Sequence, residues 1–420
     1  MTGTPRIVVT LIVFATMLVL VFVRPRRWNE AWWTMLGAAA MLVLGLVSPR
    51  EAIDGTLAGQ NALLFLLSLL SLSLLVGKSG FFDWAAIRCA RIAKGNARSL
   101  YRNAFVLGAI ITAILSLDTT AVMLTPVMLA VVKRLKLPAG PYIVLCAFVA
   151  NVGSLVLPIS NLTNILFADA FHLTFAAFAT RMIGPQIVAL VTTYAILRWH
   201  FHRELPNCFD GQSLPDAASA VPNRAYFLAC ATVLVVVLVG YFLAPIVGLE
   251  PYVIAFAGSG VLMIAGAATG RVRIRTAGEL SWDLFPFVVG LFIAVQGLEN
   301  LGMVGVAFRW LSDMKPASPE NLLATAGATA LASNVMNNLP AALIARSVLL
   351  GSHAHTNTIL AALVGADAGP MITPFGSLAT MLVLALARRE GEEVHIREFV
   401  MLGLWAVPLI VVATALVLGP

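Results

Sequence analysis

Apolar runs that are long enough to cross a lipid bilayer recur along the whole of this chain. The 420 residues are 60% hydrophobic and 11% charged, whereas a soluble globular protein carries roughly 25% charged residues. A spanning helix needs about 20 mainly apolar residues, so we predict an all-α polytopic membrane protein with about ten transmembrane helices. The predicted spans are residues 6–23, 31–48, 62–77, 140–166, 182–198, 223–243, 250–268, 283–300, 357–386 and 398–418.

Two further apolar stretches, 103–132 and 321–349, are interrupted near their middles. The first is interrupted by LDTTAVMLTP and the second by SNVMNNLP. Each half has only about 13 residues, or roughly 20 Å of helix, which is too short to span. Non-helical backbone at membrane depth is tolerated only where it is buried in protein or lines a wet cavity. We therefore predict that each stretch forms a re-entrant hairpin.

The chain contains an internal repeat on either side of one long polar segment, residues 200–222. The segment ANVGSLVLPISNLTNIL aligns without gaps on ADAGPMITPFGSLATML, with a constant offset of 216 residues (366 − 150). Apolar, glycine and proline positions coincide, and polar residues align with polar residues. We predict a first repeat at 1–199 and a second at 223–420, each with one hairpin and one broken helix near the bilayer midplane. The broken helices are expected at 140–166 and 357–386.

Lysine and arginine cluster in alternate loops, and such clusters indicate the cytoplasmic side of a membrane. This rule places the linker 200–222 in the cytoplasm and both chain termini outside. The first hairpin then enters from the cytoplasm and the second from outside, so the halves form an inverted repeat. Inverted repeats with broken helices at the midplane are typical of secondary transporters. The basic segments are Arg24–Arg27, Lys78–Arg102, Lys133–Lys136, Arg198–Arg203, Arg271–Arg275 and Arg388–Arg397, with Arg309 and Lys315 as exceptions.

The two hairpins and the two broken helices are expected to converge on one site. Proline removes a backbone donor and glycine lets a helix unwind. The resulting half-helix ends offer N–H and C=O groups to a ligand. The helix-break residues are Gly153, Pro158, Pro340, Gly369 and Pro374. The side chains predicted to bind substrate are Thr119, Thr120, Asn151, Asn161, Asn164, Asn334, Asn337, Asn338, Thr373, Ser377 and Thr380.

Asp118 and Asp367 lie inside these interrupted segments, with no lysine or arginine close by in the sequence. A central aspartate in a membrane helix costs about 2.5–3.5 kcal/mol, so a functional role is the default interpretation. We interpret both as proton-coupling groups. Thr125, by contrast, is expected to bond a carbonyl of its own helix. For Asn161 and Ser377, capping of a helix end is an equally good interpretation.

Other features of the sequence exclude some classes of function. The four cysteines form no CxxC pair, so no metal site or cofactor is predicted. The net charge of +7 comes from residues scattered through loops and does not indicate a nucleic-acid partner. No HExxH motif occurs, and AGSGVL and VGADAG lack a glycine that intramembrane proteases carry, so an enzyme is not expected. Glu299 ends a predicted span and is interpreted as a plain helix end.

Four segments carry a resemblance to a known family: LDTTAVMLTPVMLAV, ANVGSLVLPISNLTNILFADAF, SNVMNNLPAAL and ADAGPMITPFGSLATMLVL. They resemble the signature segments of the arsenite/antimonite efflux permeases, the ArsB family of the ion transporter superfamily. The family's first hairpin typically reads Asn-Asp where this chain has Leu117 and Asp118. The resemblance implies export of trivalent arsenite or antimonite, as the neutral trihydroxide, across the inner membrane in exchange for protons by alternating access. It also implies that some members work alone and others pair with a cytoplasmic arsenite-stimulated ATPase.

Two other transporter functions of the same superfamily stay open from the sequence. A sodium/proton antiporter would use the carboxylates and the carbonyl-rich breaks to bind a hard cation. A dicarboxylate or other anion transporter would hold its substrate at helix N-termini. Because Asp118 would repel an anion, this function ranks behind the other two.

Overall fold

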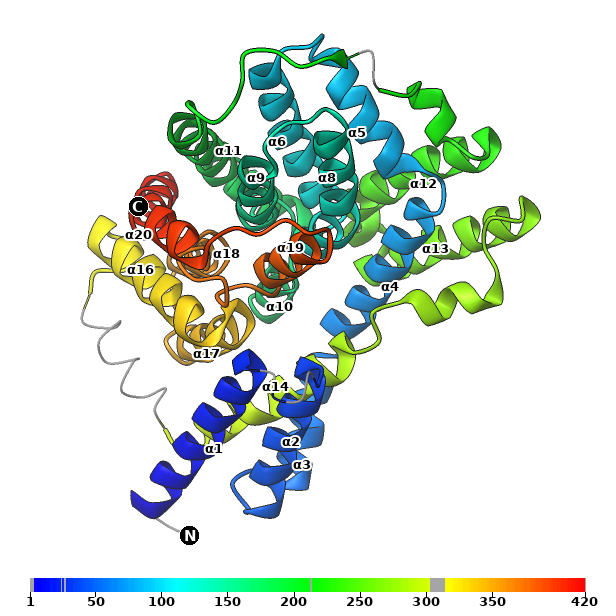
Figure 1. Cartoon of the computed structure of the whole chain (residues 1–420). Coiled ribbons are helices and arrows are strands. Elements are labelled where there is room, and N and C mark those ends of the chain that lie inside the picture. The colour runs from blue at the N-terminus through cyan, green and yellow to red at the C-terminus, as the bar shows by residue number, and fades with distance from the viewer. Residues whose placement is uncertain (1–3, 24, 26–27, 212–213, 303–313, 420) are drawn as a thin grey trace.

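The computed structural model describes residues 4–23, 25, 28–211, 214–302 and 314–419, which are almost entirely helical (Figure 1). Among them, the extended backbone pairs in a bridge between Asn96 and Cys208. The predicted all-α class is confirmed. Arg309 and three of the four residues of Arg24–Arg27 lie outside the described residues. The first helices are α1 (Thr4–Val23), α2 (Glu30–Val43), α3 (Pro49–Ala58), α4 (Gln60–Gly77), α5 (Phe81–Ile92) and α6 (Ala97–Ile114).

Six of the described helical stretches are both long and apolar enough to cross a membrane. They fall on the predicted spans 62–77, 182–198, 223–243, 250–268, 283–300 and 398–418. Of the other four predicted spans, 140–166 and 357–386 are interrupted. The span 6–23 corresponds to a shorter apolar stretch in α1, and 31–48 contains most of α2, which has 14 residues. The long helices are α4, α11 (Phe175–His200), α12 (Arg224–Leu243), α13 (Pro251–Ala268), α14 (Leu284–Glu299) and α20 (Ile396–Leu416).

The first helical hairpin turns at Ser116, which lies before the interruption that the sequence predicts at 117–126. Its second arm runs through α7 (Leu117–Thr119), a π-helical turn (Thr120–Leu124) and α8 (Thr125–Arg134). The wide π turn lies directly before Pro126, whose missing N–H would otherwise break the helix. Asp118 therefore lies in the first turn of a helix and not in irregular backbone.

The arms of this hairpin are also longer than predicted. Asn96 caps α6 by accepting a hydrogen bond from the Ser99 N–H at 2.9 Å, so the helix begins at Ala97 and includes polar residues before the apolar stretch. Each arm, 97–114 and 117–134, has 18 residues where about 13 were expected. The arms are therefore longer than predicted, although neither is among the described stretches that are long and apolar enough to cross a membrane.

The second hairpin joins α16 (Pro319–Met336) to α17 (Asn338–Gly351) and turns at Asn337. Asn337 has a φ of +80° and a ψ of 155°, a backbone conformation that residues other than glycine rarely adopt. Its side-chain oxygen accepts a hydrogen bond from the Leu339 N–H at 3.3 Å and so caps α17. This turn lies within the predicted interruption SNVMNNLP.

The two broken helices are interrupted where the sequence predicts. The first comprises α9 (Ala139–Val152) and α10 (Leu162–Ala170), and the second α18 (Thr356–Ala368) and α19 (Leu378–Arg389). The ends of the first arms differ by 216 residues (368 − 152), and so do the starts of the second arms (378 − 162). The backbone thus keeps the register of the gap-free sequence alignment.

Packing between the two halves of the chain surrounds these breaks. α4 packs on α13, and α14 packs on α2; near the centre, α9 packs on α19 and α10 on α18. Most residues of α9 and α18 are buried, so the broken helices form the core of the molecule.

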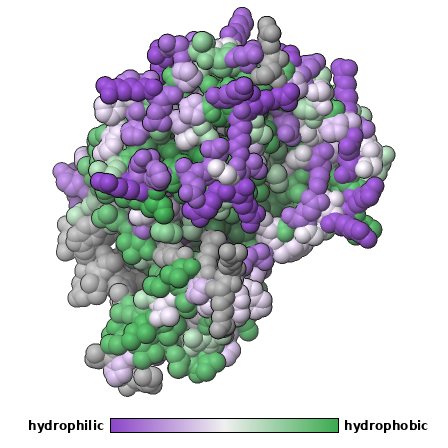
Figure 2. Space-filling view, in the orientation of Figure 1, coloured by the Kyte–Doolittle hydropathy of each residue, from purple (hydrophilic) through white to green (hydrophobic). Residues whose placement is uncertain are grey.

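The two ends of the molecule differ in charge. At the end that we call the linker end, Arg91 pairs with Asp216 of the linker at 3.5 Å, and Lys78 pairs with Glu279. The other end, which we call the opposite end, holds the loops after α2, α10 and α12. Figure 2 shows hydrophilic residues over the part of the visible face where Figure 1 places α5, α11 and the linker, and a hydrophobic region over α1 and α2.

Candidate functional site

Four half-helices begin at one small cavity in the centre of the molecule. The cavity has a volume of about 50 Å³ and is lined by the first residues of four helical arms, Leu117, Leu162, Asn338 and Leu378. The first N–H groups of a helix have no partner within the helix, and together they form its positive end. At α17 these groups are already used, because the Asn338 N–H donates to the Gly376 carbonyl at 2.8 Å, the Leu339 N–H donates to Asn337 Oδ1 and Pro340 has none. The starts of α7, α10 and α19 favour a ligand that presents oxygen lone pairs. The polar side chains that line it are Asp118, Asn161, Asn337 and Asn338.

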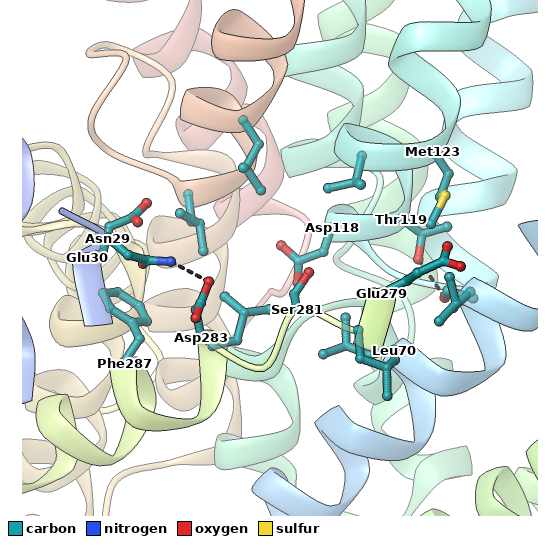
Figure 3. A pocket seen from close by; sticks show the side chains of 17 residues that line it. Asn29, Glu30, Leu70, Asp118, Thr119, Met123, Glu279, Ser281, Asp283 and Phe287 are labelled. Carbon is teal, nitrogen blue, oxygen red and sulfur yellow. Dashed lines mark hydrogen bonds between the residues drawn. The ribbon is translucent and has the colours of Figure 1, made fainter. Parts of the chain in front are cut away.

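A larger cavity of about 190 Å³ continues from this centre toward the linker end. The two cavities share Asp118, Leu284, Phe287 and Leu378 in their linings. The larger one extends to Glu279, whose carboxylate pairs with Lys78 at the surface. In Figure 3 the side chains of Asp118, Ser281 and Asp283 project into the same space, and Asn29 donates to Asp283. A solute can therefore approach Asp118 from the linker end.

Asp118 is half-buried and lines both cavities. Beside it, Thr119 shares hydrogen bonds with Ser73 of α4 at 2.7 Å and with Ser116 at 3.0 Å. These hydroxyls hold the turn of the first hairpin against α4. Thr120 lies one residue further on but is bonded to Thr112 at 2.7 Å and lines neither cavity.

Asp367 is completely buried and links the two halves of the chain. One oxygen of its carboxylate accepts hydrogen bonds from Asn161 Nδ2 at 2.8 Å and from Thr163 Oγ1 at 2.7 Å, at the start of α10. The repeat places Asn151 at the equivalent position, and Asn151 Nδ2 donates to Thr380 Oγ1 at 2.9 Å, at the start of α19. Each broken helix thus holds the second arm of the other.

The side-chain amides of Asn334 and Asn164 form hydrogen bonds with backbone groups of the irregular segments. Asn334 Nδ2 donates to the carbonyl of Gly369 at 2.8 Å, and Asn334 Oδ1 accepts from the N–H of Thr373 at 2.9 Å. Asn164 Nδ2 donates to the carbonyls of Ser154 and Leu157 within the first break. These side chains shape the breaks and do not line the central cavity.

The predicted site residues therefore fall into two groups. Asp118, Thr119, Asn161, Asn337 and Asn338 line the cavities. The others line neither cavity and lie in the broken helices, in the π turn or, for one asparagine, on α16; they are Thr120, Asn151, Asn164, Asn334, Asp367, Thr373, Ser377 and Thr380.

Several buried oxygen atoms in the broken helices have no hydrogen-bond partner among the described residues. They are Asn151 Oδ1, Asn164 Oδ1, Asp367 Oδ2 and Ser377 Oγ. Buried polar groups are nearly always paired with protein, water or an ion. Within the described part of the chain, no three His, Cys, Asp or Glu side chains gather as a metal-binding group.

The predicted helix-break residues are at the breaks. A Cβ on Gly153 would lie 2.5 Å from the Val149 carbonyl oxygen, and one on Gly369 would lie 2.4 Å from the Ala330 Cβ, so both positions need glycine. Pro158 starts a short 3₁₀ turn in the first break, and Pro374 lies in the second. Pro340 is the third residue of α17, where a missing N–H costs little.

Sequence reasoning missed the residues that other elements bring to the site. Ser73, Glu279, Asp283 and Phe287 line the larger cavity but belong to segments that carry no break. It also missed Arg346, a cation in the second hairpin whose Nε is buried. An arginine within an apolar arm is itself a signal of function and would have been the means of finding it.

Comparisons with known proteins agree with this architecture. The chain matches the family described as "Arsenical pump membrane protein" over residues 9–418. It is 33% identical over 389 residues to the arsenical pump membrane protein of Escherichia coli K12 and 34% identical over 385 residues to that of Yersinia enterocolitica, with 89% of each chain covered. The putative arsenical pump membrane protein of Bacillus subtilis is 23% identical over 434 residues, covering 96% of this chain and 97% of its own.

A solved structure has the same fold. The YdaH transporter of Alcanivorax borkumensis superimposes with a TM-score of 0.58 over 88% of this chain and 86% of its own, at 18% identity. Helix order, central breaks and sequence identity thus agree: this chain is a multi-pass membrane transporter, not an enzyme, and belongs to the arsenical pump membrane protein family.

Proposed function

We propose that this chain exports trivalent arsenite or antimonite, as the neutral trihydroxide, across the inner membrane in exchange for protons. The observation that carries the proposal is the central cavity, where four helix N-termini surround a carboxyl group that can be reached from the linker end. Membership of the arsenical pump family supports the substrate.

The chemistry of the cavity suits a small uncharged hydroxide. Its oxygen lone pairs can accept from the helix N–H groups, and its hydroxyls can donate to Asp118 and to the amide oxygens of Asn337 and Asn338. A volume of about 50 Å³ has room for a solute of a few heavy atoms, such as a trihydroxide with four. A dicarboxylate is larger and would be repelled by an ionised Asp118.

The orientation follows from the charged loops. Lys78, Arg91, Lys133 and the linker lie at the linker end, so we assign this end to the cytoplasm and both termini to the outside. The equal offsets of the two breaks and the paired packing of α4 with α13 and of α14 with α2 support an inverted repeat. In this orientation the 190 Å³ cavity opens to the cytoplasm, which corresponds to an inward-facing conformation.

Proton coupling is assigned first to Asp118 and second to Asp367. Asp118 can exchange a proton with the cytoplasm through the larger cavity, and a proton bound there would compete with the hydroxide for the carboxylate oxygens. Asp367 is sealed from both cavities, and a proton on it would weaken its hold on Asn161 and Thr163. Pairing with a cytoplasmic ATPase, which the resemblance implies for some members, would take place at the linker end.

Everted membrane vesicles test the proposal. Arsenite uptake should require an inward-acidic pH gradient and should be lost in Asp118→Asn. Asp54→Asn is the matched control, because Asp54 is an exposed carboxylate on α3, paired with Arg50 and remote from the cavities. Gradient-driven uptake that survives in Asp118→Asn would remove the coupling role of this residue.

A sodium/proton antiporter is the second candidate, and one observation favours it. The unpartnered oxygens of Asn151, Asn164 and Asp367 are hard ligands of the kind that bind alkali and alkaline-earth cations. Sodium-dependent proton flux in the same vesicles, unaffected by arsenite, would establish this function in place of arsenite export.

A further inference from the structure

The search for a further role leads to a charged cluster at the opposite end, which the proposed transport step does not use. Arg346 lies on α17, two turns beyond the helix start at the central cavity. Its guanidinium interacts electrostatically with the carboxylates of Glu299, the last residue of α14, and Asp169, near the end of α10. A buried charge is costly unless it is paired, and Arg346 Nε is buried, so this side chain calls for a function.

Hydrogen bonds attach this cluster to helices on both sides. Glu299 accepts a hydrogen bond from Ser347 of α17, and Asp169 accepts one from Asn61 of α4 at 3.3 Å. The helical arms α10 and α17, which begin at the central cavity, are thereby tied to α4 and α14. Arg346 Nε is buried without a hydrogen-bond partner among the described residues, and the residue next to it, Ser347, bonds to Glu299.

The two ends of the molecule differ at these same helices. At the opposite end, α10 packs on α4, and α17 packs on α14. At the linker end the helices do not close on one another. Instead, the 190 Å³ cavity lies between them and is lined by α4, α14, α19 and the second arm of the first hairpin. The molecule is therefore closed at the opposite end and open at the linker end.

A second cavity lies directly beyond the closed contact. It has a volume of about 360 Å³ and is lined by Asn61 and Phe65 of α4, by Ile165 and Asp169 of α10, and by Pro158 of the first break. Because α4 and α10 both line it, a movement of α10 away from α4 would join this cavity to the central one.

We propose that Arg346, Glu299 and Asp169 form a gate that keeps the opposite end closed while the central cavity is open to the linker end. Arg346 attracts both carboxylates across the contacts of α17 with α10 and α14, where Glu299 also accepts from Ser347 and Asp169 from Asn61. Separation of these helices admits water and opens the exit route through the 360 Å³ cavity. This inference rests on the proposed transport cycle, in which the central cavity must open to each side in turn. It does not depend on which solute the cavity binds.

Cysteine accessibility tests the gate without any transport measurement. Val288 of α14 is buried and lines the central cavity, so Val288→Cys reports whether a membrane-impermeant maleimide reaches the centre. The unmodified chain gives the background, since Cys89, Cys146 and Cys230 are buried and Cys208 is in the linker. Labelling from the linker end, in everted vesicles, serves as the positive control.

In the Val288→Cys background, Arg346→Gln should raise the labelling rate from the opposite end at least severalfold, whereas Arg346→Lys should leave it low. Asp169→Asn is the second variant: its amide oxygen can still accept from Asn61, so only the charge is lost, and the residue is exposed enough to tolerate the change. It should also raise the rate. Equal labelling of Asp169→Asn and the parent would overturn the gate, whether or not Arg346→Gln folds. Because no arsenite is present, this result is independent of the substrate assignment.

Discussion

Replacing Gly365 by alanine should disturb the central site through a steric clash that can be sized from the structure. Gly365 lies on α18, where this helix packs against α16. An added Cβ would lie 2.2 Å from the carbonyl oxygen of Ala326, and ordinary contact begins at 3.4 Å. The helices must therefore separate by as much as 1.2 Å (3.4 − 2.2), because the clashing atom belongs to the backbone.

The displacement reaches the site because Asp367 is only two residues further along α18. If Asp367 moves by the full distance, its 2.8 Å bond to Asn161 lengthens to about 4 Å, beyond the range of a hydrogen bond. Overpacking of a core typically costs about 1–3 kcal/mol. We expect a lower thermal unfolding midpoint in detergent, measured by size-exclusion after heating, and a loss of arsenite uptake in vesicles.

Gly327→Ala provides the matched control for this prediction. Gly327 lies on α16, but a Cβ there would meet no atom within 4 Å. Alanine favours a helix over glycine by up to about 1 kcal/mol, so this variant should be as stable as the parent or more so. If Gly365→Ala has the same unfolding midpoint as Gly327→Ala and still transports arsenite, the reasoning from close helix packing is refuted.

Two further predictions concern the breaks. Asn334→Ala removes the acceptor of the Ile372 and Thr373 N–H groups and the donor to Gly369. We expect destabilisation of about 1–3 kcal/mol per group left buried and unpaired, visible as a lower unfolding midpoint, and an unchanged midpoint would contradict this role. Asp367→Asn keeps an acceptor for Asn161 and Thr163, so its unfolding midpoint should stay near that of the parent. Uptake driven by the pH gradient should fall, because the amide cannot take up a proton. An unfolding midpoint as low as that of Asp367→Ala would contradict this account.

Local sequence patterns predicted the broken helices well because glycine and proline act on their own neighbours. Gly153 and Gly369 have no room for a side chain, and the gap-free alignment placed both breaks correctly. The first hairpin was harder to predict, since the threonine-rich run after Ser116 resembles a break. In the structure this run stays helical, because it forms a π turn and the Thr125 hydroxyl donates to the carbonyl of Thr120. Thr125 was expected to bond a carbonyl of its own helix.

Arg346 could be noticed from its apolar surroundings, but its partners could not be found by any local pattern. Arg346 is 47 residues from Glu299 (346 − 299) and 177 from Asp169 (346 − 169), and each carboxylate looks like an ordinary helix end in the sequence. Only the packing of α10, α14 and α17 brings them together. The sequence also could not show which polar residues line the cavities and which only hold the backbone in place, because Asn and Thr do both in this chain.

The unequal placement of the acids distinguishes the two halves of the chain. Aligning the hairpin turns, Ser116 with Asn337, sets Asp118 opposite Leu339, while the broken helices set Asp367 opposite Asn151. Two halves inserted in opposite directions, as proposed above, would each carry both acids had they stayed identical. The acids are therefore positions at which the halves differ: Asp118 lines the cavities, whereas Asp367 lies in the packed core. The direction of net transport is set by the gradients across the membrane, so this asymmetry decides which group meets the proton and not which way the solute moves.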